Sequence, residues 1–133
     1  NNYDDIIVSN IKKGNQLIKA KERIPKLFSF YGSTRLITNH SGATFIKKEI
    51  HNKLGYYDES YIILADSKFL INCFLKKYNF RYLNFTSSIM GVNGISIKRK
   101  RLVYLELYRL IDDLKISKIL NLLILNFRLF TKR

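Results

Sequence analysis

The spacing of hydrophobic residues predicts strands and helices in mixed order along the chain. Two short apolar runs, at 6–9 and 43–46, have the length and composition of buried strands. The second run leads directly into a predicted helix at 47–54, and Gly55 follows where a left-handed residue commonly ends a helix. The stretch at 12–26 is rich in Lys and contains Gly14 and the only proline, Pro25, so we expect an irregular excursion from the core there.

The second half of the chain contains the clearest helical pattern. Hydrophobic residues at 66–78 repeat at intervals of three and four. Alternation at 80–85 predicts a half-buried strand, and 88–90 a further short one. Two helices are predicted at 103–114 and 116–130, the second apolar nearly all round. In the first of these two helices, the polar residues expected to lie off the apolar stripe are Glu106, Arg109, Asp112 and Asp113.

The composition indicates a folded domain, and the net charge indicates which kinds of partner the domain could bind. Of the 133 residues, 47% are hydrophobic and 14% aromatic, which is typical of a chain that folds around a core. The net charge of +14 favours an anionic partner such as nucleic acid, nucleotide phosphates or an anionic membrane surface. The single cysteine, Cys73, excludes an internal disulfide and lies in an apolar run, so we expect a buried thiol.

Several common chemistries have no motif here. The sequence contains no Walker loop, no Gly-x-Gly-x-x-Gly and no Asp-x-Asp. Its two histidines, His40 and His51, are too few for a histidine-rich metal site. His51 lies within a Lys-rich helix face, and we expect it to be a solvated surface residue.

Four motifs in a fixed order carry a resemblance to a known family. They are Asn-His-Ser-Gly-Ala-Thr-Phe-Ile-Lys-Lys-Glu at 39–49, Lys-Leu-Gly-Tyr-Tyr-Asp-Glu-Ser at 53–60, Leu-Ala-Asp-Ser-Lys-Phe-Leu at 64–70 and Gly-Val-Asn-Gly-Ile-Ser at 91–96. In this order and spacing they resemble the C-terminal half of bacterial family-2 glycosyltransferases, the inverting GT-A type. The resemblance covers about residues 27–97, more than half of the chain.

The resemblance implies an α/β fold, namely the C-terminal portion of a GT-A domain with a mixed sheet, flanking helices and a C-terminal helical pair. Residues 1–97 would form the acceptor side of the glycosyltransferase domain, and 98–133 a basic amphipathic helical segment. In the family, a nucleotide-binding half ending in a metal-binding Asp-x-Asp precedes this region, and 3–8 resembles the strand soon after that motif. The complete enzyme would then use a divalent metal, Mn or Mg, with ligands outside this chain, and the chain alone would be inactive.

Asp66 is the residue to which the resemblance assigns catalysis. In the family, the Asp at this helix start deprotonates an acceptor hydroxyl, which attacks the anomeric carbon with inversion. Such a general base must be ionised at neutral pH and within hydrogen-bond reach of the hydroxyl. A helix N-terminus favours the charged form. The alternative role for Asp66 is a helix N-cap, and the two roles are compatible.

The resemblance suggests substrate-binding roles for four further residues. His40 is expected to line the substrate pocket, and the alternative is a structural histidine bonded to a loop carbonyl. Asp58 is expected to orient the acceptor, and the alternative is a turn in which its carboxylate binds backbone amides. Gly94 and Ser96 are expected to form a loop near the donor phosphates, because glycine lets the backbone approach a ligand closely.

The C-terminal third is basic. Its run Lys98–Arg101 allows three interpretations: a solvated helix start, contact with anionic lipid headgroups, or nucleic-acid binding, which the shortness of the run disfavours. The apolar strip expected at 116–130, with cations beside it, would attach to the inner membrane face or, alternatively, form a homodimer.

Together these features predict a hexosyltransferase-like enzyme that transfers a sugar from a nucleotide-sugar to a glycan or lipid-linked acceptor, in assembly of polysaccharide or other cell-envelope glycans. We expect a cytoplasmic location, with peripheral attachment to the inner membrane face. The alternative from a different class is a non-catalytic basic domain that binds nucleic acid or anionic membrane.

Overall fold

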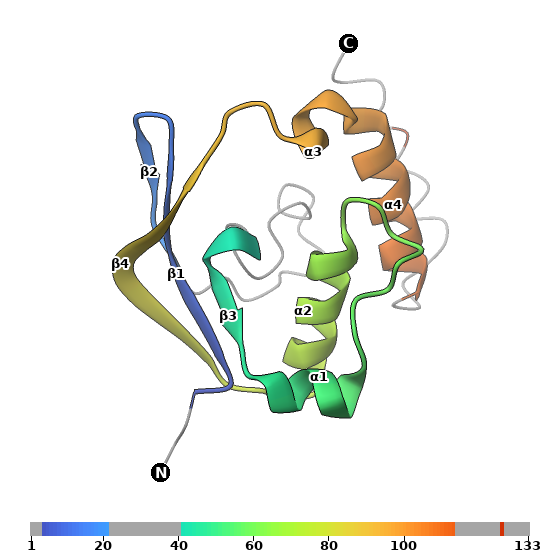
Figure 1. Ribbon diagram of the computed structural model, residues 1–133. Coiled ribbons are helices and arrows are strands. Elements are labelled where there is room, and N and C mark those ends of the chain that lie inside the picture. The colour runs from blue at the N-terminus through green and yellow to red at the C-terminus, as the bar shows by residue number, and fades with distance from the viewer. Residues whose placement is uncertain (1–3, 22–40, 114–125, 127–133) are drawn as a thin grey trace.

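The computed structural model describes residues 4–21, 41–113 and 126, and these form a mixed α/β architecture (Figure 1). A four-stranded sheet lies on one side of the molecule, and the main helices pack on the other. The α/β class expected from the sequence is confirmed. The candidate His40 lies outside the described residues, as does the helix expected at 116–130 except for its one described position.

Strand β1, Ile6–Lys13, is the central strand of the sheet. Along one edge it pairs antiparallel with β3, Thr44–Ile46, and with the short β2, Gln16–Ile18. Along its other edge it pairs parallel with β4, Phe80–Met90, so the sheet is mixed as expected. Because β1 has partners on both edges and is covered on both faces, its residues from Ile6 to Ile11 are buried almost without interruption rather than alternately.

The described part of the stretch predicted to be irregular contains the β1–β2 hairpin instead, so that prediction is wrong. Strand β1 continues to Lys13, and Ile11 pairs with Ile18 across a two-residue turn. The first turn residue, Gly14, has a φ of 55°, a value that favours glycine and is typical of short hairpin loops. Strand β2 is largely exposed, so no burial imposes a hydrophobic period on its sequence.

One bent strand, β4, replaces the two strands predicted at 80–85 and 88–90 (Figure 1). Its register against β1 shifts twice, between Val8 and Asn10 and between Asn10 and Ile11. Irregularities of this kind insert extra residues into one strand and interrupt the alternation of its side chains. The sequence pattern therefore broke where the strand bends, although the hydrogen bonding continues.

Polar side chains join the strands near this bend. The buried Ser9 donates its hydroxyl to the Ala43 carbonyl at 3.3 Å. The buried Asn10 donates to Asn84 Oδ1 at 3.1 Å and accepts from the Ala20 backbone N–H at 2.7 Å. Since these buried groups are paired, they specify the register of the irregular region at little cost in desolvation.

The described residues form four α-helices, which are α1 (Lys48–Leu54), α2 (Ala65–Leu75), α3 (Ile95–Lys98) and α4 (Lys100–Asp113), and a short 3₁₀ helix, η1 (Ser41–Ala43). Helix α1 ends as predicted, because Gly55 has a φ of 86° and donates its N–H to the His51 carbonyl. The main core cluster consists of Ile6, Val8, Ile50, Tyr61, Leu64, Phe69, Leu70, Ile71, Cys73, Leu107, Leu110 and Ile111. Cys73 is buried as expected, and burial raises the pKa of its thiol to about 11.

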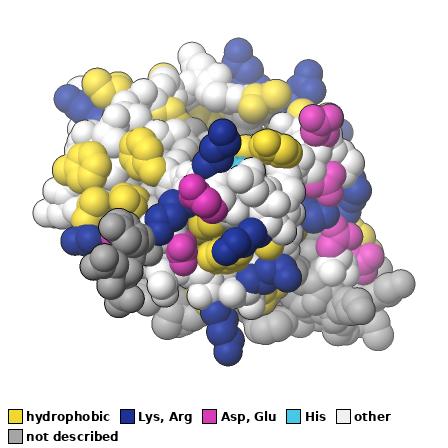
Figure 2. Space-filling model, turned by 60° about the horizontal axis from the view of Figure 1, so that its bottom comes forward, with side chains coloured by type: hydrophobic (Ala, Val, Ile, Leu, Met, Phe, Trp, Pro, Cys, Tyr) yellow, Lys and Arg dark blue, Asp and Glu magenta, His cyan; other side chains and the backbone are white. Residues whose placement is uncertain are grey.

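The surface is not uniform. Figure 2 shows hydrophobic side chains gathered at the left of the molecule, where Figure 1 places the sheet. Phe45 on β3 and Phe85 on β4 are both about half exposed. Elsewhere on the face in Figure 2, basic and acidic side chains lie interspersed.

Candidate active site

Asp66, the predicted catalytic base, lies in the first turn of α2. The helix begins at Ala65, and the preceding residue, Leu64, makes no side-chain capping hydrogen bond. Asp66 is therefore not the N-cap, and that part of the sequence interpretation is wrong. A first-turn position still lies at the positive end of the helix dipole, which favours an ionised carboxylate.

The two oxygens of the Asp66 carboxylate have different surroundings. Oδ1 accepts a hydrogen bond from the Ser67 backbone N–H at 2.6 Å and a longer one from the Ser67 hydroxyl at 3.3 Å. Oδ2 receives no hydrogen bond from the residues that the structure describes. The residue is half-buried. The carboxylate is thus held through one oxygen, while the other can accept a proton or a hydrogen bond from a ligand.

A buried glutamate on α4 anchors the segment that leads into α2. Glu106 is only 6% exposed, and its carboxylate accepts hydrogen bonds from three consecutive backbone N–H groups. The donors are Ile62 at 2.6 Å, Ile63 at 2.9 Å and Leu64 at 2.8 Å. These amides immediately precede α2, so Glu106 fixes the start of that helix against α4 and, through it, the position of Asp66.

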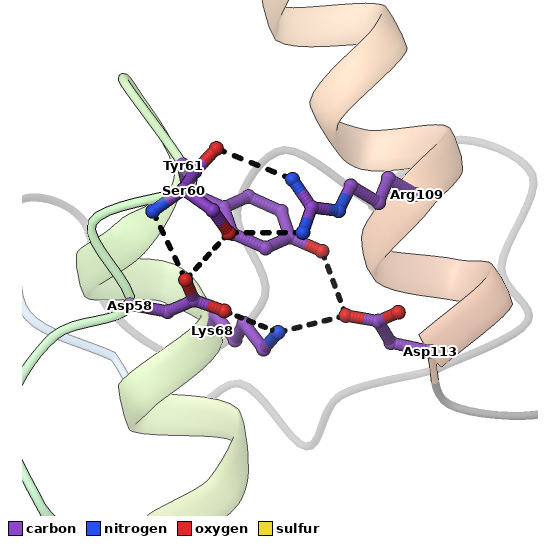
Figure 3. A network of polar contacts seen from close by, with 6 residues as sticks. All are labelled: Asp58, Ser60, Tyr61, Lys68, Arg109 and Asp113. Carbon is purple, nitrogen blue, oxygen red and sulfur yellow. Dashed lines mark hydrogen bonds and ion pairs between the residues drawn. The ribbon is translucent and has the colours of Figure 1, made fainter.

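A second set of contacts holds the same segment to α4 (Figure 3). Lys68 on α2 donates to Asp58 at 2.8 Å and to Asp113 at 2.7 Å. Arg109 on α4 donates to the Ser60 carbonyl at 3.2 Å and to the Ser60 hydroxyl at 2.9 Å. We call this set, together with Tyr61 and Glu106, the α4 clamp.

Tyr61 is the buried centre of the α4 clamp. The residue is 3% exposed, and the cationic groups of Lys68 and Arg109 each lie 4.6 Å from the centroid of its ring. Its hydroxyl donates to Asp113 Oδ2 at 2.9 Å. Burial, together with this hydrogen bond, raises the pKa of Tyr61 to about 12. The phenol is therefore neutral at physiological pH and acts as a donor, not as a base.

Asp58 adopts the turn that the sequence allowed as its alternative role. Its Oδ1 accepts from the Ser60 backbone N–H at 3.0 Å and from the Ser60 hydroxyl, and its Oδ2 is paired with Lys68. The hydrogen bond from Lys68 and those from Ser60 hold the pKa of Asp58 well below its usual range. Both oxygens of Asp58 already have protein partners, and its role in orienting the acceptor stays a prediction.

An aromatic cluster lies beside Asp66 and corrects the prediction of a solvated His51. The His51 ring stacks on Phe69 with centroids 4.5 Å apart, and on Tyr56 at 5.8 Å. Its Nδ1 is buried, and among the described residues it has no hydrogen-bond partner. Tyr57 packs edge-on against both His51 and Phe69. Burial, and then the nearby charge of Asp66, raise the pKa of Tyr57.

Gly94 and Ser96 lie at the start of α3, apart from the α4 clamp along the chain. Gly94 has φ −65° and ψ 160°, which any residue can adopt. A Cβ added there would meet only Ser96 Oγ, at 3.9 Å. Both residues are exposed. The backbone conformation therefore does not require glycine, and the role of both residues near donor phosphates stays a prediction.

The described residues contain no group of three or more His, Cys, Asp or Glu side chains that could hold a metal ion. Within the same ranges, no helix has the length and hydrophobicity needed to cross a membrane. The metal expected for the complete enzyme therefore has no ligand set of this kind among the described side chains.

Glu106 is the residue that the sequence interpretation placed wrongly. It was expected off the apolar stripe of its helix, but it is three residues after Val103 and four before Leu110, which are both buried. Residues at these spacings share a helix face. A glutamate on the buried face of a helix therefore indicates that its carboxylate accepts hydrogen bonds from other groups of the protein, because an unpaired buried charge is costly.

Comparisons of this chain with protein-family models, curated proteins and solved structures find no match. The functional assignment therefore depends on the side chains themselves. Of the residues that the sequence singled out, Asp66 lies near Tyr57 of the aromatic cluster, on the helix that Lys68 ties to α4.

Proposed function

We propose that this chain is the acceptor side of an inverting family-2 glycosyltransferase of the GT-A type, with Asp66 as the general base. The observation that carries the proposal is the carboxylate of Asp66, which is held at a helix start through one oxygen while the other has no partner among the described residues. A base of this kind needs a fixed direction and a free lone pair.

The contrast with Asp58 supports this choice of base. Asp58 also resembles a family motif, but its carboxylate accepts hydrogen bonds at both oxygens and is paired with Lys68. The pKa of Asp58 is lowered by these contacts, which makes it a poor proton acceptor. Of these two predicted carboxylates, Asp66 is the one with capacity for a substrate hydroxyl.

The proposed reaction follows from this geometry. Asp66 takes the proton from an acceptor hydroxyl, and the hydroxyl oxygen forms a bond to the anomeric carbon of the donor sugar from the face opposite the leaving group. The bond from that carbon to the nucleoside diphosphate breaks, and the diphosphate leaves with the electron pair. The α4 clamp contributes by preventing α2 from shifting, because a displacement of about 1 Å in a catalytic group can cost roughly 100-fold in rate.

The finer parts of the assignment rest on the sequence resemblance. The donor is a nucleotide-sugar, the acceptor a glycan or lipid-linked sugar, and the process cell-envelope glycan assembly at the inner face of the membrane. Mn or Mg would belong to the complete enzyme. The mixed α/β sheet with helices packed on it is compatible with this fold type.

The test is sugar transfer by the full-length product of the gene that encodes this chain, followed as release of nucleoside diphosphate. Asp66→Asn keeps the size and polarity of the side chain but removes the base, so turnover should fall roughly 100-fold or more. Asp112→Asn, at an exposed carboxylate on α4, is the matched control and should keep wild-type turnover. Wild-type turnover in Asp66→Asn would show that Asp66 is not the base.

A further inference from the structure

The segment from Gly91 to Arg101 is the most exposed stretch of the described chain. Every residue in it is exposed, including the four consecutive cations Lys98–Arg101. The sequence has no Asp or Glu between Arg81 and Glu106, and Glu106 is buried on its backbone donors. None of the four cations forms an ion pair with another described residue.

Aliphatic side chains accompany these cations at the surface. Val92 is 53% exposed, Ile95 48% and Ile97 41%. Leu105, 53% exposed, follows Arg101 by four residues on α4 and so lies on the same helix face. Isolated exposed aliphatic residues are common on protein surfaces, but a group of them within one short segment indicates a surface that contacts something.

The fold does not account for the cations. Helix α4 begins at Lys100 and has no acidic residue in its first turn. Lys100 and Arg101 therefore lie at the positive end of the helix dipole, where cations are unfavourable. Elsewhere in the described chain, by contrast, Lys68 and Arg109 have specific partners. Four consecutive exposed cations without an ion pair among the described residues, two of them at an unfavourable helix end, point to a partner that supplies the negative charge.

The chemistry of the segment selects the kind of partner. A nucleic acid could neutralise the four cations, but single-strand recognition uses aromatic side chains as stacking platforms, and 91–101 contains none. Contact with phosphates would also leave Val92, Ile95 and Ile97 in water. A bilayer surface satisfies both components, because headgroups pair with cations while aliphatic side chains enter the acyl boundary.

We propose that residues 91–101, together with Leu105, form a contact surface for an anionic lipid bilayer. This surface is a different one from the strip expected at 116–130, which lies outside the described residues, and it does not depend on the proposed glycosyl transfer. In Figure 1, α3 and the start of α4 lie at the opposite end of the molecule from α1. The surface is therefore well separated from a control set of lysines on α1.

Vesicle flotation of the full chain tests the proposal, with phosphatidylcholine vesicles that contain either no phosphatidylglycerol or about 30 mol % of it. Binding should require the anionic lipid and should weaken between ~0.1 M and ~0.5 M NaCl. Lys98→Gln/Lys100→Gln should lower the partition coefficient by roughly 30-fold. The matched control, Lys48→Gln/Lys53→Gln on exposed positions of α1, removes the same charge and should change it by less than about twofold.

The aliphatic side chains need their own variant, because a protein of net charge +14 can bind anionic vesicles without a specific surface. Ile95→Ser/Ile97→Ser changes no charge and should lower the partition coefficient by roughly tenfold. Equal losses in the 98/100 variant and the α1 control would overturn the proposal in favour of diffuse attraction. An unchanged partition coefficient for the serine variant would overturn the bilayer contact, and competition by a duplex oligonucleotide would then identify nucleic acid as the partner.

Discussion

The two ends of helix α4 use charged residues in opposite ways. Toward the C-terminal end, Glu106, Arg109 and Asp113 all have defined partners in the segment 58–68. At the N-terminal end, Lys100 and Arg101 are exposed and form no ion pair with a described residue. The difference shows that charge on one helix can serve the fold at one end and remain available to a partner at the other.

The reason for the difference is what each end faces. The C-terminal half packs against a segment whose backbone N–H groups have no strand or helix partner, so a carboxylate there replaces hydrogen bonds that water would otherwise make. The N-terminal end faces solvent, where an isolated cation is well hydrated and contributes little to folding. Stability should therefore depend strongly on the first set and hardly on the second.

The largest effect is expected from Glu106→Ala. The substitution leaves three backbone N–H groups without their acceptor, among them that of the buried Leu64, and should lower the free energy of unfolding by about 3 kcal/mol. Urea unfolding followed by circular dichroism measures the change. Asp112→Asn, on the exposed side of the same helix, should shift it by less than about 0.5 kcal/mol. Similar midpoints for the two variants would contradict the role of Glu106 as an anchor.

Several helices of this fold could be predicted from the sequence, and the elements that could not be predicted share one physical reason. Helix α1 was predicted to within one residue at each end because Gly55 marks its C-terminus, and α2 was predicted at its start because its buried face imposes a regular period, although it ends three residues before the predicted pattern does. Strand β2 and the bend of β4 were not predicted, because backbone pairing at an exposed edge and at a bulge needs no particular side chain.

The candidate site was predicted in part for the same reason. The sequence allowed Asp66 as the N-cap of α2, but the structure places it in the first helical turn, and the segment before the helix is held by Glu106, 40 positions later in the chain. Nothing local in the sequence around Asp66 indicates such a partner. The sequence does contain a signal at Glu106 itself, because a glutamate whose spacing places it among buried residues of a helix needs hydrogen-bond donors inside the protein.

A smaller effect is expected from Lys68, the cation that joins two carboxylates of the α4 clamp. Its hydrogen bonds are the main cause that lowers the pKa of Asp58 and of Asp113 in the folded state. A carboxyl group whose pKa is lowered on folding stabilises the protein above its unfolded pKa of about 4, and this stabilisation is lost as the pH falls through the lower folded value. The wild-type protein should therefore lose stability progressively below about pH 4.

Lys68→Met tests this assignment. The variant should be less stable at neutral pH by on the order of 1 kcal/mol, and its stability should decline less steeply below about pH 4 than that of the wild type. Thermal unfolding at a series of pH values measures both. Lys76→Met, at an exposed lysine just after the same helix, should keep the wild-type pH profile. If the stability of Lys68→Met fell below about pH 4 as steeply as that of the wild type, other carboxyl groups would control the loss of stability in acid.

The smallest effect is expected at the N-terminal end of α4, and its sign is the informative part. Lys100→Gln/Arg101→Gln removes two cations from the positive end of the helix dipole, so the free energy of unfolding should rise by about 0.5 kcal/mol. The gain should grow as the salt concentration is lowered, because the repulsion lies at the surface and is screened by ions. Lys53→Gln, in the last turn of α1, removes a cation from the favourable end of a helix and should produce a small loss instead. Melting temperatures at two salt concentrations distinguish these outcomes. Should the double variant be destabilised, the two cations contribute to the fold after all, and the contrast between the ends of α4 disappears.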